Sequence, residues 1–289
     1  MVETAGGARR QAHFRNGIRT LVVYVLMIAL AVAMMLPFVW MVSTALKARG
    51  AEFTYPPQWV PDPVKWGNFR EALTSLPFHL FFRNTLTITL ANVVGTLIVA
   101  SMSAYAFARV NFFGRKFWFR VVLATMMLPS VITMVPNYII MTKLNWVDTF
   151  LPLTVPSILG GGAFYIFILR QFFAGIPREL DEAARMDGAG HLRILFQIIL
   201  PLAKPALASV AVLSFIANWN EFLYALIYLD SMEKKTLSIG LRLFQTQYVT
   251  RWNLMMAAST VVVLPVIAMF FFAQKYFVEG VALTGLSGR

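Results

Sequence analysis

The sequence LVVYVLMIALAVAMMLPFVWMVSTAL, residues 21–46, runs for 26 residues without a charged side chain. A helix that crosses the hydrocarbon core of a bilayer needs about 20 mostly apolar residues. Five more runs of similar length follow, and the only charged residue inside them is Glu221. They span 84–108, 121–142, 149–169, 205–229 and 252–274. Six such runs disfavour buried helices of a soluble protein. They predict an all-α, polytopic membrane protein of six transmembrane helices.

The composition supports a membrane protein. Of 289 residues, 58% are apolar and 13% are charged, whereas soluble domains average roughly 45–50% and about 25%. Cysteine is absent, which excludes disulfides and Cys-ligated metal, and the three histidines are scattered, so we expect no metal site. The net charge of +12 lies in loops between apolar runs. There it favours contact with anionic membrane lipid, and we expect no nucleic-acid partner.

The basic residues predict which side of the membrane holds the termini. Six helices place both termini on one side, and that side would carry 15 basic residues against 10 on the other. Because cytoplasmic loops are enriched in Lys and Arg, we expect both termini in the cytoplasm. The chain is then organised as a cytoplasmic tail 1–20, a first helix 21–46, an external loop 47–83, a core 84–276 and a cytoplasmic tail 277–289.

Prolines and glycines interrupt two of the predicted helices. Pro129 and Pro136 lie in the third run, and Pro152 and Pro156 lie at the start of the fourth. Each proline removes a backbone hydrogen bond that lipid cannot replace, so these stretches should face other helices or a water-filled path. An ordinary kink is the alternative. Three consecutive glycines, 160–162, mark a flexible or closely packed point.

The cytoplasmic loop 170–204 carries the signals of a short helix. Pro177 suits the first helical position, and Gly188 suits the left-handed residue that follows a helix. Acidic residues in the first turns favour the helix dipole. These are Glu179, Asp181 and Glu182. The loop therefore predicts a helix over Pro177–Asp187.

A helix this short is marginal in water and must pack against something. One face is small and shallow, which suits a groove on another protein. It comprises Leu180, Ala183, Ala184 and Asp187. The alternative is a helix that lies on lipid, but four acids and only two arginines argue against that, because such helices are usually rich in Lys and Arg.

The same loop resembles the EAA loop of permease subunits in binding-protein-dependent ABC importers. The matching residues are Glu182-Ala183-Ala184, then three residues, Gly188, then nine residues, and Ile198-Ile199-Leu200-Pro201. Flanking sequence is similar to the maltose-type second permease subunit of carbohydrate importers. It includes Gln171-Phe172-Phe173, Asp187-Gly188-Ala189, the segment 103–109 (SAYAFAR) and the segment 218–222 (NWNEF).

This resemblance implies the permease subunit of an ATP-driven sugar or oligosaccharide importer in a prokaryotic inner membrane. The chain has no GxxxxGK[ST] loop, so no cofactor is expected in it, and ATP and Mg²⁺ would be bound by two partner ATPase subunits. A second permease, of a different chain, and an external solute-binding protein would complete the complex. The coupling helix between the fourth and fifth spans would contact the ATPase through Arg178, Glu179, Leu180, Glu182, Ala183, Ala184, Asp187 and Gly188.

Glu221 suggests where the solute passes, because an ionisable residue within a membrane span is a functional candidate by default. Its neighbours Asn218, Trp219 and Asn220 offer amides and an aromatic face that suit sugar hydroxyls and rings. We therefore expect these four residues along the solute pathway. A hydrogen-bonded hinge or a gate contact with the second permease is the alternative.

Other functions are compatible with part of the pattern. The importer could carry a non-sugar solute such as glycerol phosphate, although no basic residue lies within a span. A secondary transporter or channel would explain six spans and Glu221, but it leaves the capped acidic helix without a role. An intramembrane enzyme is disfavoured because the spans hold no His–metal, Ser–Lys or paired-Asp constellation.

Overall fold

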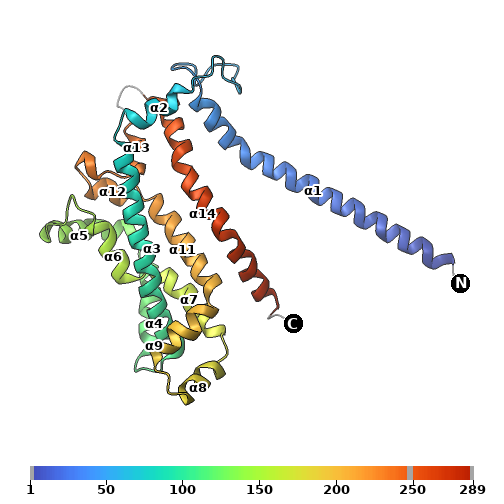
Figure 1. The fold of residues 1–289 in the computed structure, drawn as a ribbon, viewed down its shortest axis with the longest axis vertical. Coiled ribbons are helices and arrows are strands. Elements are labelled where there is room, and N and C mark those ends of the chain that lie inside the picture. The colour runs from blue at the N-terminus through green and yellow to red at the C-terminus, as the bar shows by residue number, and fades with distance from the viewer. Residues whose placement is uncertain (1–2, 246–249, 287–289) are drawn as a thin grey trace. The chain divides into compact units, whose positions relative to one another are not determined.

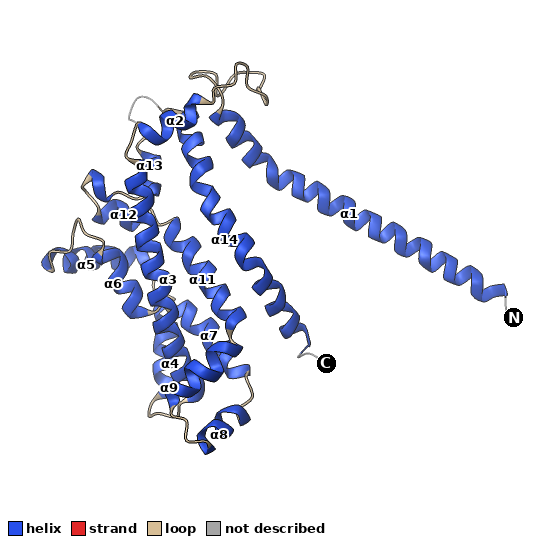
Figure 2. Cartoon of the chain, viewed as in Figure 1, coloured by secondary structure: helices blue, strands red, loops and turns tan. Residues whose placement is uncertain are grey.

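A computed structural model describes residues 3–245 and 250–286, and within these ranges the chain forms helices and no β-strand (Figures 1 and 2). The chain divides into two compact units. The first comprises Met1–Ala72 with Thr250–Thr260, and the second comprises Leu73–Val249 with Val261–Arg289. The all-helical prediction is confirmed.

The first unit is built on the long helix α1 (Glu3–Ala45), which begins well inside the predicted N-terminal tail. A side chain from the start of α2 holds the end of α1. The side-chain amide of Asn68 donates to the carbonyls of Ala45 and Lys47, both at 2.8 Å. The Lys47 ammonium is buried 4.0 Å from the centre of the Trp40 ring. Burial lowers the pKa of Lys47, because it disfavours the charged form.

In the second unit, helix α3 (Phe78–Arg109) is central and packs against α6 (Leu151–Gly160), α7 (Ala163–Gly175) and α11 (Lys204–Trp219). Ala100 and Ala104 lie one turn apart on α3 and are fully buried. Small residues at this spacing let helix backbones approach closely, so the core of the unit forms around α3.

The remaining helices have 14 residues or fewer, except for the long helix α14. They are α2 (Gly67–Thr74), α4 (Arg115–Thr125), α5 (Ser130–Lys143), α8 (Glu179–Met186), α9 (His191–Ile194), the π-turn η1 (Leu195–Ile199), α10 (Leu200–Leu202), α12 (Leu223–Tyr228), the 3₁₀ turn η2 (Met232–Lys234), α13 (Leu237–Arg242) and α14 (Trp252–Leu286).

The third predicted span, 121–142, is not one helix. Helix α4 ends at Thr125 and α5 begins at Ser130, and Pro129 between them is extended with φ −60° and ψ 129°. Proline has no N–H to donate and disfavours a helical conformation at the residue before it, which explains the break. Pro136, by contrast, is accommodated within α5.

The fourth and fifth predicted spans are also interrupted. Gly161 and Gly162, at φ 60° and 66°, separate α6 from α7. Helix α11 ends at Trp219, three residues before α12. At its other end, α11 meets the helical segment His191–Leu202 at a bend of 82°.

Among the described residues, four helices are long and apolar enough to cross a membrane, or five if the bent pair around Ala203 counts as one. These are Gly17–Ala45, Phe78–Arg109, Leu151–Gly175 and Trp252–Lys275, with His191–Leu202 plus Lys204–Trp219 as the bent pair. The predicted count of six is not reached by this criterion, because the 121–142 run is split at Pro129.

Candidate functional site

The first candidate site is the short helix α8, Glu179–Met186. It is shorter than the predicted helix over Pro177–Asp187. Pro177 lies outside it, and the carbonyl of Arg178 accepts the first backbone hydrogen bonds, from the N–H groups of Asp181 (2.9 Å) and Glu182 (3.1 Å). The three acidic residues do lie in the first turn, as predicted.

The C-terminal end of α8 is confirmed as predicted. Gly188 has φ +77°, which is the left-handed conformation. Its N–H donates to the carbonyl of Arg185, and the N–H of Ala189 donates to the carbonyl of Ala184, both at 2.9 Å. This pair of bonds is the Schellman motif, which fixes the direction in which the chain leaves the helix.

The face of α8 that packs against the rest of the chain differs from the predicted docking face. Asp181 and Ala184, three positions apart, are the buried residues of α8. Ala184 belongs to the core cluster around α3 and is therefore not free to contact a partner. The physical reason is size, because an alanine allows α8 to lie close to the core. The other predicted coupling residues are exposed: Arg178, Glu179, Leu180, Glu182, Ala183, Asp187 and Gly188.

Asp181 forms a buried ion pair with Arg109, the last residue of α3. The Arg109 Nη1 lies 3.6 Å from the Asp181 Oδ2, and the two side chains are only 1% and 8% exposed. The Arg109 Nη2 also donates to the carbonyl of Ile176 at 2.5 Å. Sequence reasoning placed Asp181 in the first turn of the helix but did not identify its partner. The sequence offered one signal for this partner: Arg109 is the only charged residue in the segment 103–109.

The second candidate site is a cavity of about 380 Å³ in the second unit. It lies where α5, α6 and the break between α11 and α12 meet. Its lining residues are Asn137, Met141, Pro152, Leu153, Pro156, Ser157, Asn218, Glu221, Tyr224 and Tyr228. Pro152 and Pro156 thus face a cavity, in agreement with the sequence analysis.

Two of the four predicted pathway residues line this cavity. Asn218 accepts a 2.5 Å hydrogen bond from Asn92 of α3 and donates to the carbonyl of Ser214 at 2.8 Å. The carboxylate of Glu221 lines the cavity and also accepts from the N–H of Tyr224 at 2.9 Å. Glu221 therefore combines a place in the cavity wall with a structural role at the start of α12.

The other two predicted pathway residues lie elsewhere. Trp219 is buried, stacks on Phe215 with ring centres 5.3 Å apart, and donates from Nε1 to the carbonyl of Val262 at 3.2 Å. Asn220 follows the end of α11, is exposed, and donates from its side chain to the carbonyl of Ile216 in the last turn of that helix. Neither side chain lines the cavity.

Three tyrosine rings lie nearly parallel beside the cavity, and sequence reasoning missed them. The rings of Tyr138 and Tyr228 have centres 5.9 Å apart and planes at 16°, and those of Tyr228 and Tyr224 are 6.4 Å apart at 10°. The i, i+4 spacing of Tyr224 and Tyr228 on α12 was a signal, but Tyr138 comes from a distant helix, α5. Aromatic faces of this kind suit the apolar faces of sugar rings.

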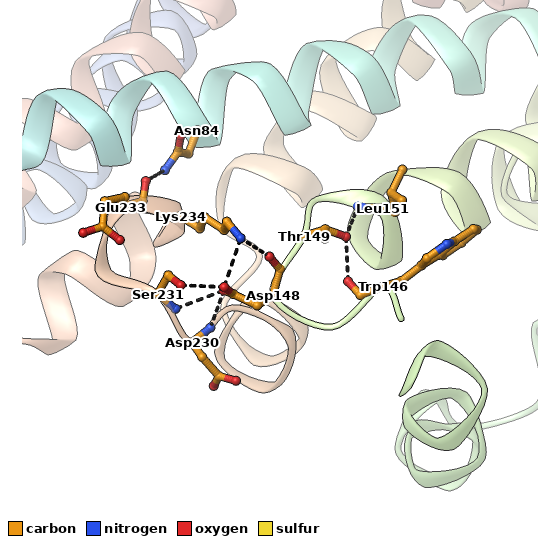
Figure 3. A network of polar contacts seen from close by, with 9 residues as sticks. All are labelled: Asn84, Trp146, Asp148, Thr149, Leu151, Asp230, Ser231, Glu233 and Lys234. Carbon is orange, nitrogen blue, oxygen red and sulfur yellow. Dashed lines mark hydrogen bonds and ion pairs between the residues drawn. The ribbon is translucent and has the colours of Figure 1, made fainter. Parts of the chain in front are cut away.

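A polar network joins the loop after α5 to the loop after α12, and Asp148 is at its centre (Figure 3). One carboxylate oxygen accepts from the N–H groups of Asp230 and Ser231, both at 3.0 Å. The other accepts from the Ser231 hydroxyl at 2.5 Å and from the Lys234 ammonium at 3.0 Å. The bonds from Ser231, together with those from Lys234 and Asp230, hold the pKa of Asp148 well below its usual range.

Replacing Asp148 with Asn is expected to lower the free energy of unfolding at neutral pH by about 1–2 kcal/mol, because the bonds to a charged acceptor are lost. The lowered pKa means that the folded state favours the ionised carboxylate. The stabilisation is therefore full above the ordinary aspartate pKa of about 4 and is lost as the pH falls below it. Thermal unfolding from pH 7 to pH 3 should show a gap between wild type and variant that narrows with acid.

Asp230→Asn is the matched control for that measurement, because Asp230 contributes its backbone N–H to the network, and its carboxylate is exposed. Its unfolding temperature should match that of the wild type across the pH range. An equal loss of stability in both variants would contradict the role assigned to Asp148.

Comparisons with known proteins identify related sequences and a related structure. The model of a family described as the binding-protein-dependent transport system inner membrane component matches residues 96–282. The arabinooligosaccharides transport system permease protein AraQ of Halalkalibacterium halodurans is 38% identical over 247 residues, which cover 85% of this chain and 86% of that protein. The trehalose/maltose transport system permease protein MalG of Thermococcus litoralis is 32% identical, covering 91% and 95%.

A solved structure with the same fold is a bacterial ABC transporter involved in the import of the acidic polysaccharide alginate. One of its chains superposes with a TM-score of 0.78 at 27% identity, covering 90% of this chain and 96% of that chain.

Proposed function

Because the chain belongs to the family of inner membrane components of binding-protein-dependent transport systems, we propose that it forms half of the translocation pathway of an importer for an oligosaccharide. The chain is a membrane-spanning permease subunit of an ABC importer. The substrate class is supported by the relatives, which are named for arabinooligosaccharides and for trehalose and maltose. The chemistry of the cavity supports it independently.

The lining of the cavity is the observation that supports a sugar as the solute. Its wall combines amide, hydroxyl and carboxylate groups with tyrosine rings, and such groups hydrogen-bond to sugar hydroxyls while the rings stack on sugar faces. The side-chain amide of Asn137 makes no hydrogen bond with the described part of the chain, so it is available to a solute. The break between α11 and α12 lies at this cavity. Irregular backbone within a membrane is tolerated where it lines a cavity.

A phosphorylated solute such as glycerol phosphate fits this cavity less well. Anionic phosphate groups are usually bound by Arg or Lys, and no lining residue is basic. The one carboxylate, Glu221, would repel such a solute.

The rest of the complex follows from a division of labour. The sequence lacks an ATP-binding loop, so two separate ATPase subunits hydrolyse ATP and bind α8 through its exposed residues. A second permease of a different chain completes the pathway, and an external binding protein delivers the solute. The complex lies in a prokaryotic inner membrane. ATP-driven closure of the ATPase pair moves α8 and shifts the spans between inward-open and outward-open packings.

In this arrangement both termini are cytoplasmic and the chain crosses the membrane six times. The split pair α4 and α5 together forms the third crossing. Four basic residues support a cytoplasmic position for the loop between α3 and α4. They are Arg109, Arg115, Lys116 and Arg120. A stand-alone secondary transporter would leave α8, whose outer side is exposed, without a function.

Replacing Asn137 with Ala is expected to lower the rate of oligosaccharide uptake about fivefold, because one hydrogen bond to the solute, worth about 1 kcal/mol, is lost. Uptake would be measured in proteoliposomes that contain the assembled importer, with saturating binding protein and a panel of arabino-, malto- and chito-oligosaccharides. ATP hydrolysis in the absence of solute should not change.

Asn220→Ala is the control for Asn137→Ala, because Asn220 is an exposed asparagine that does not line the cavity. Wild-type uptake by Asn137→Ala for every sugar tested would remove the cavity from the pathway.

A further inference from the structure

We propose that the buried ion pair between Arg109 and Asp181 is the joint through which α8 moves α3. This inference rests on the proposed role of α8 as the ATPase-coupling helix. It makes Arg109 a positioning residue, because it acts through α8 and touches neither solute nor nucleotide.

The attachment of α8 to the rest of its own chain is slight. Asp181 and Ala184 are its buried residues, and the side chain of Ala184 is a single methyl group. Asp181 is therefore the one polar anchor of α8 on α3 within the described residues. Motion imposed on the exposed side of α8 must pass through this anchor, through the small contact of Ala184 with the core, or through the backbone on either side.

Arg109 holds two points of the cytoplasmic loop at once. Its Nη1 faces the Asp181 carboxylate, and its Nη2 donates to the carbonyl of Ile176, which follows the end of α7. Pro177 and Arg178 lie between these two points. The guanidinium thus ties the end of α7, the start of α8 and the end of α3 together.

Burial makes the Arg109–Asp181 ion pair costly to separate. With side chains 1% and 8% exposed, the two charges are shielded from salt and water. Removing one partner of such a pair leaves an uncompensated buried charge, which is strongly unfavourable. Two exposed charges at the same distance would contribute little.

The geometry also leaves room for the pair to tighten. At 3.6 Å the two groups form an ion pair and not a hydrogen bond, and the Asp181 Oδ1 and the Arg109 Nε have no hydrogen-bond partner. The gap could shorten by roughly 0.8 Å before it reaches the 2.8 Å typical of a charge-assisted bond. A displacement of α8 could therefore shorten the distance between Arg109 and Asp181 while α8 remains helical.

Helix α3 connects this joint to the candidate solute cavity. Asn92 lies 17 residues before Arg109 on the same helix, about 25 Å along its axis. Its amide donates to the carbonyl of Leu153 at 2.9 Å and to the side chain of Asn218 at 2.5 Å, and both of those residues line the cavity. A shift of α3 along or about its axis would thus reach the cavity wall.

The test uses the complete importer in proteoliposomes with the single variants Arg109→Gln and Asp181→Asn. We expect the ATPase subunits to remain bound and ATP hydrolysis to continue, while solute uptake falls about tenfold or more, so that more ATP is consumed per solute. The conservative variant Asp181→Glu should retain most of the coupling. Arg115→Gln is the matched control, because Arg115 bonds to Val110 and Asn111 and not to α8.

A double variant, Arg109→Met with Asp181→Leu, separates coupling from stability. Apolar replacement of both members of a buried pair is often neutral or stabilising, so this variant should unfold at or above the wild-type temperature yet remain uncoupled. A wild-type ratio of ATP to solute in the double variant or in both single variants would overturn the proposal.

Release of the ATPase subunits from the single variants would also overturn the proposal. The ion pair would then be needed only to position α8 for ATPase binding, and not to transmit its motion. Binding of the ATPases by the wild-type chain is measured first in the same experiment. It tests the proposed function separately from the role of the ion pair.

Discussion

Replacing Glu182 with Lys is expected to abolish oligosaccharide uptake and to weaken the binding of the ATPase subunits by at least about 30-fold, or roughly 2 kcal/mol. Glu182 is exposed on α8 beside the small residue Ala183, where a partner surface can approach closely. Reversal of its charge in a desolvated contact removes an attraction and adds a repulsion. Its contribution to the helix itself is smaller, because a first-turn acid stabilises a helix by about 0.3–1 kcal/mol.

Two measurements check this prediction: co-purification of the ATPase subunits with the permease, and uptake in proteoliposomes. The Glu182→Lys chain should insert and fold normally. Glu233→Lys is the control, because it makes the same charge change at an exposed residue in a different part of the chain, the 3₁₀ turn η2. Normal uptake by Glu182→Lys would refute the assignment of α8 as the coupling helix.

Replacing Gly161 with Val is expected to lower the free energy of unfolding by about 3 kcal/mol or more, which corresponds to a fall in unfolding temperature on the order of 10 °C. Gly161 has φ +60°, which is costly for a β-branched residue. An added Cβ would also lie 3.0 Å from the backbone nitrogen of Ala100 and 3.0 Å from the Val99 side chain. The backbone of α3 cannot move away without disturbing the core.

Thermal unfolding of the purified chain in detergent checks the effect of Gly161→Val. The neighbouring variant Gly160→Val is the control, because a Cβ at Gly160 meets nothing within 4 Å and no positive φ is found there. We expect Gly160→Val to be expressed at the wild-type level and to unfold at about the wild-type temperature. Equal destabilisation of the two variants would show that the close approach of α3 to Gly161 is not the cause.

Features set by local sequence were the most accessible to prediction. Charge-free length locates α1, α3 and α14, because the requirement for about 20 apolar residues acts on each segment alone. The end of α8 at Gly188 was equally predictable, since a left-handed residue after a helix is a local preference for glycine. The interruptions at Pro129 and Gly161 were visible as residue types, but their outcome was not. Whether a proline kinks a helix or ends it depends on what surrounds it.

The contacts that build the two candidate sites were much less accessible. Arg109 and Asp181 are far apart in sequence, as are Asp148 and Ser231, and no local rule pairs them. The inward position of Ala184, which was predicted on the docking face of α8, was missed for the same reason. Helical spacing groups Ala184 with Leu180 and Ala183, but only the position of the core shows that Ala184 points inward.

The network around Asp148 has a consequence for the conditions in which the protein works. Its bonds keep that carboxylate negatively charged at acidities where unassisted carboxylates begin to take up protons. The two loops it joins therefore remain connected in mildly acidic solution. Tolerance of mild acid at this junction thus depends on one side chain, whose replacement would also weaken the junction at neutral pH.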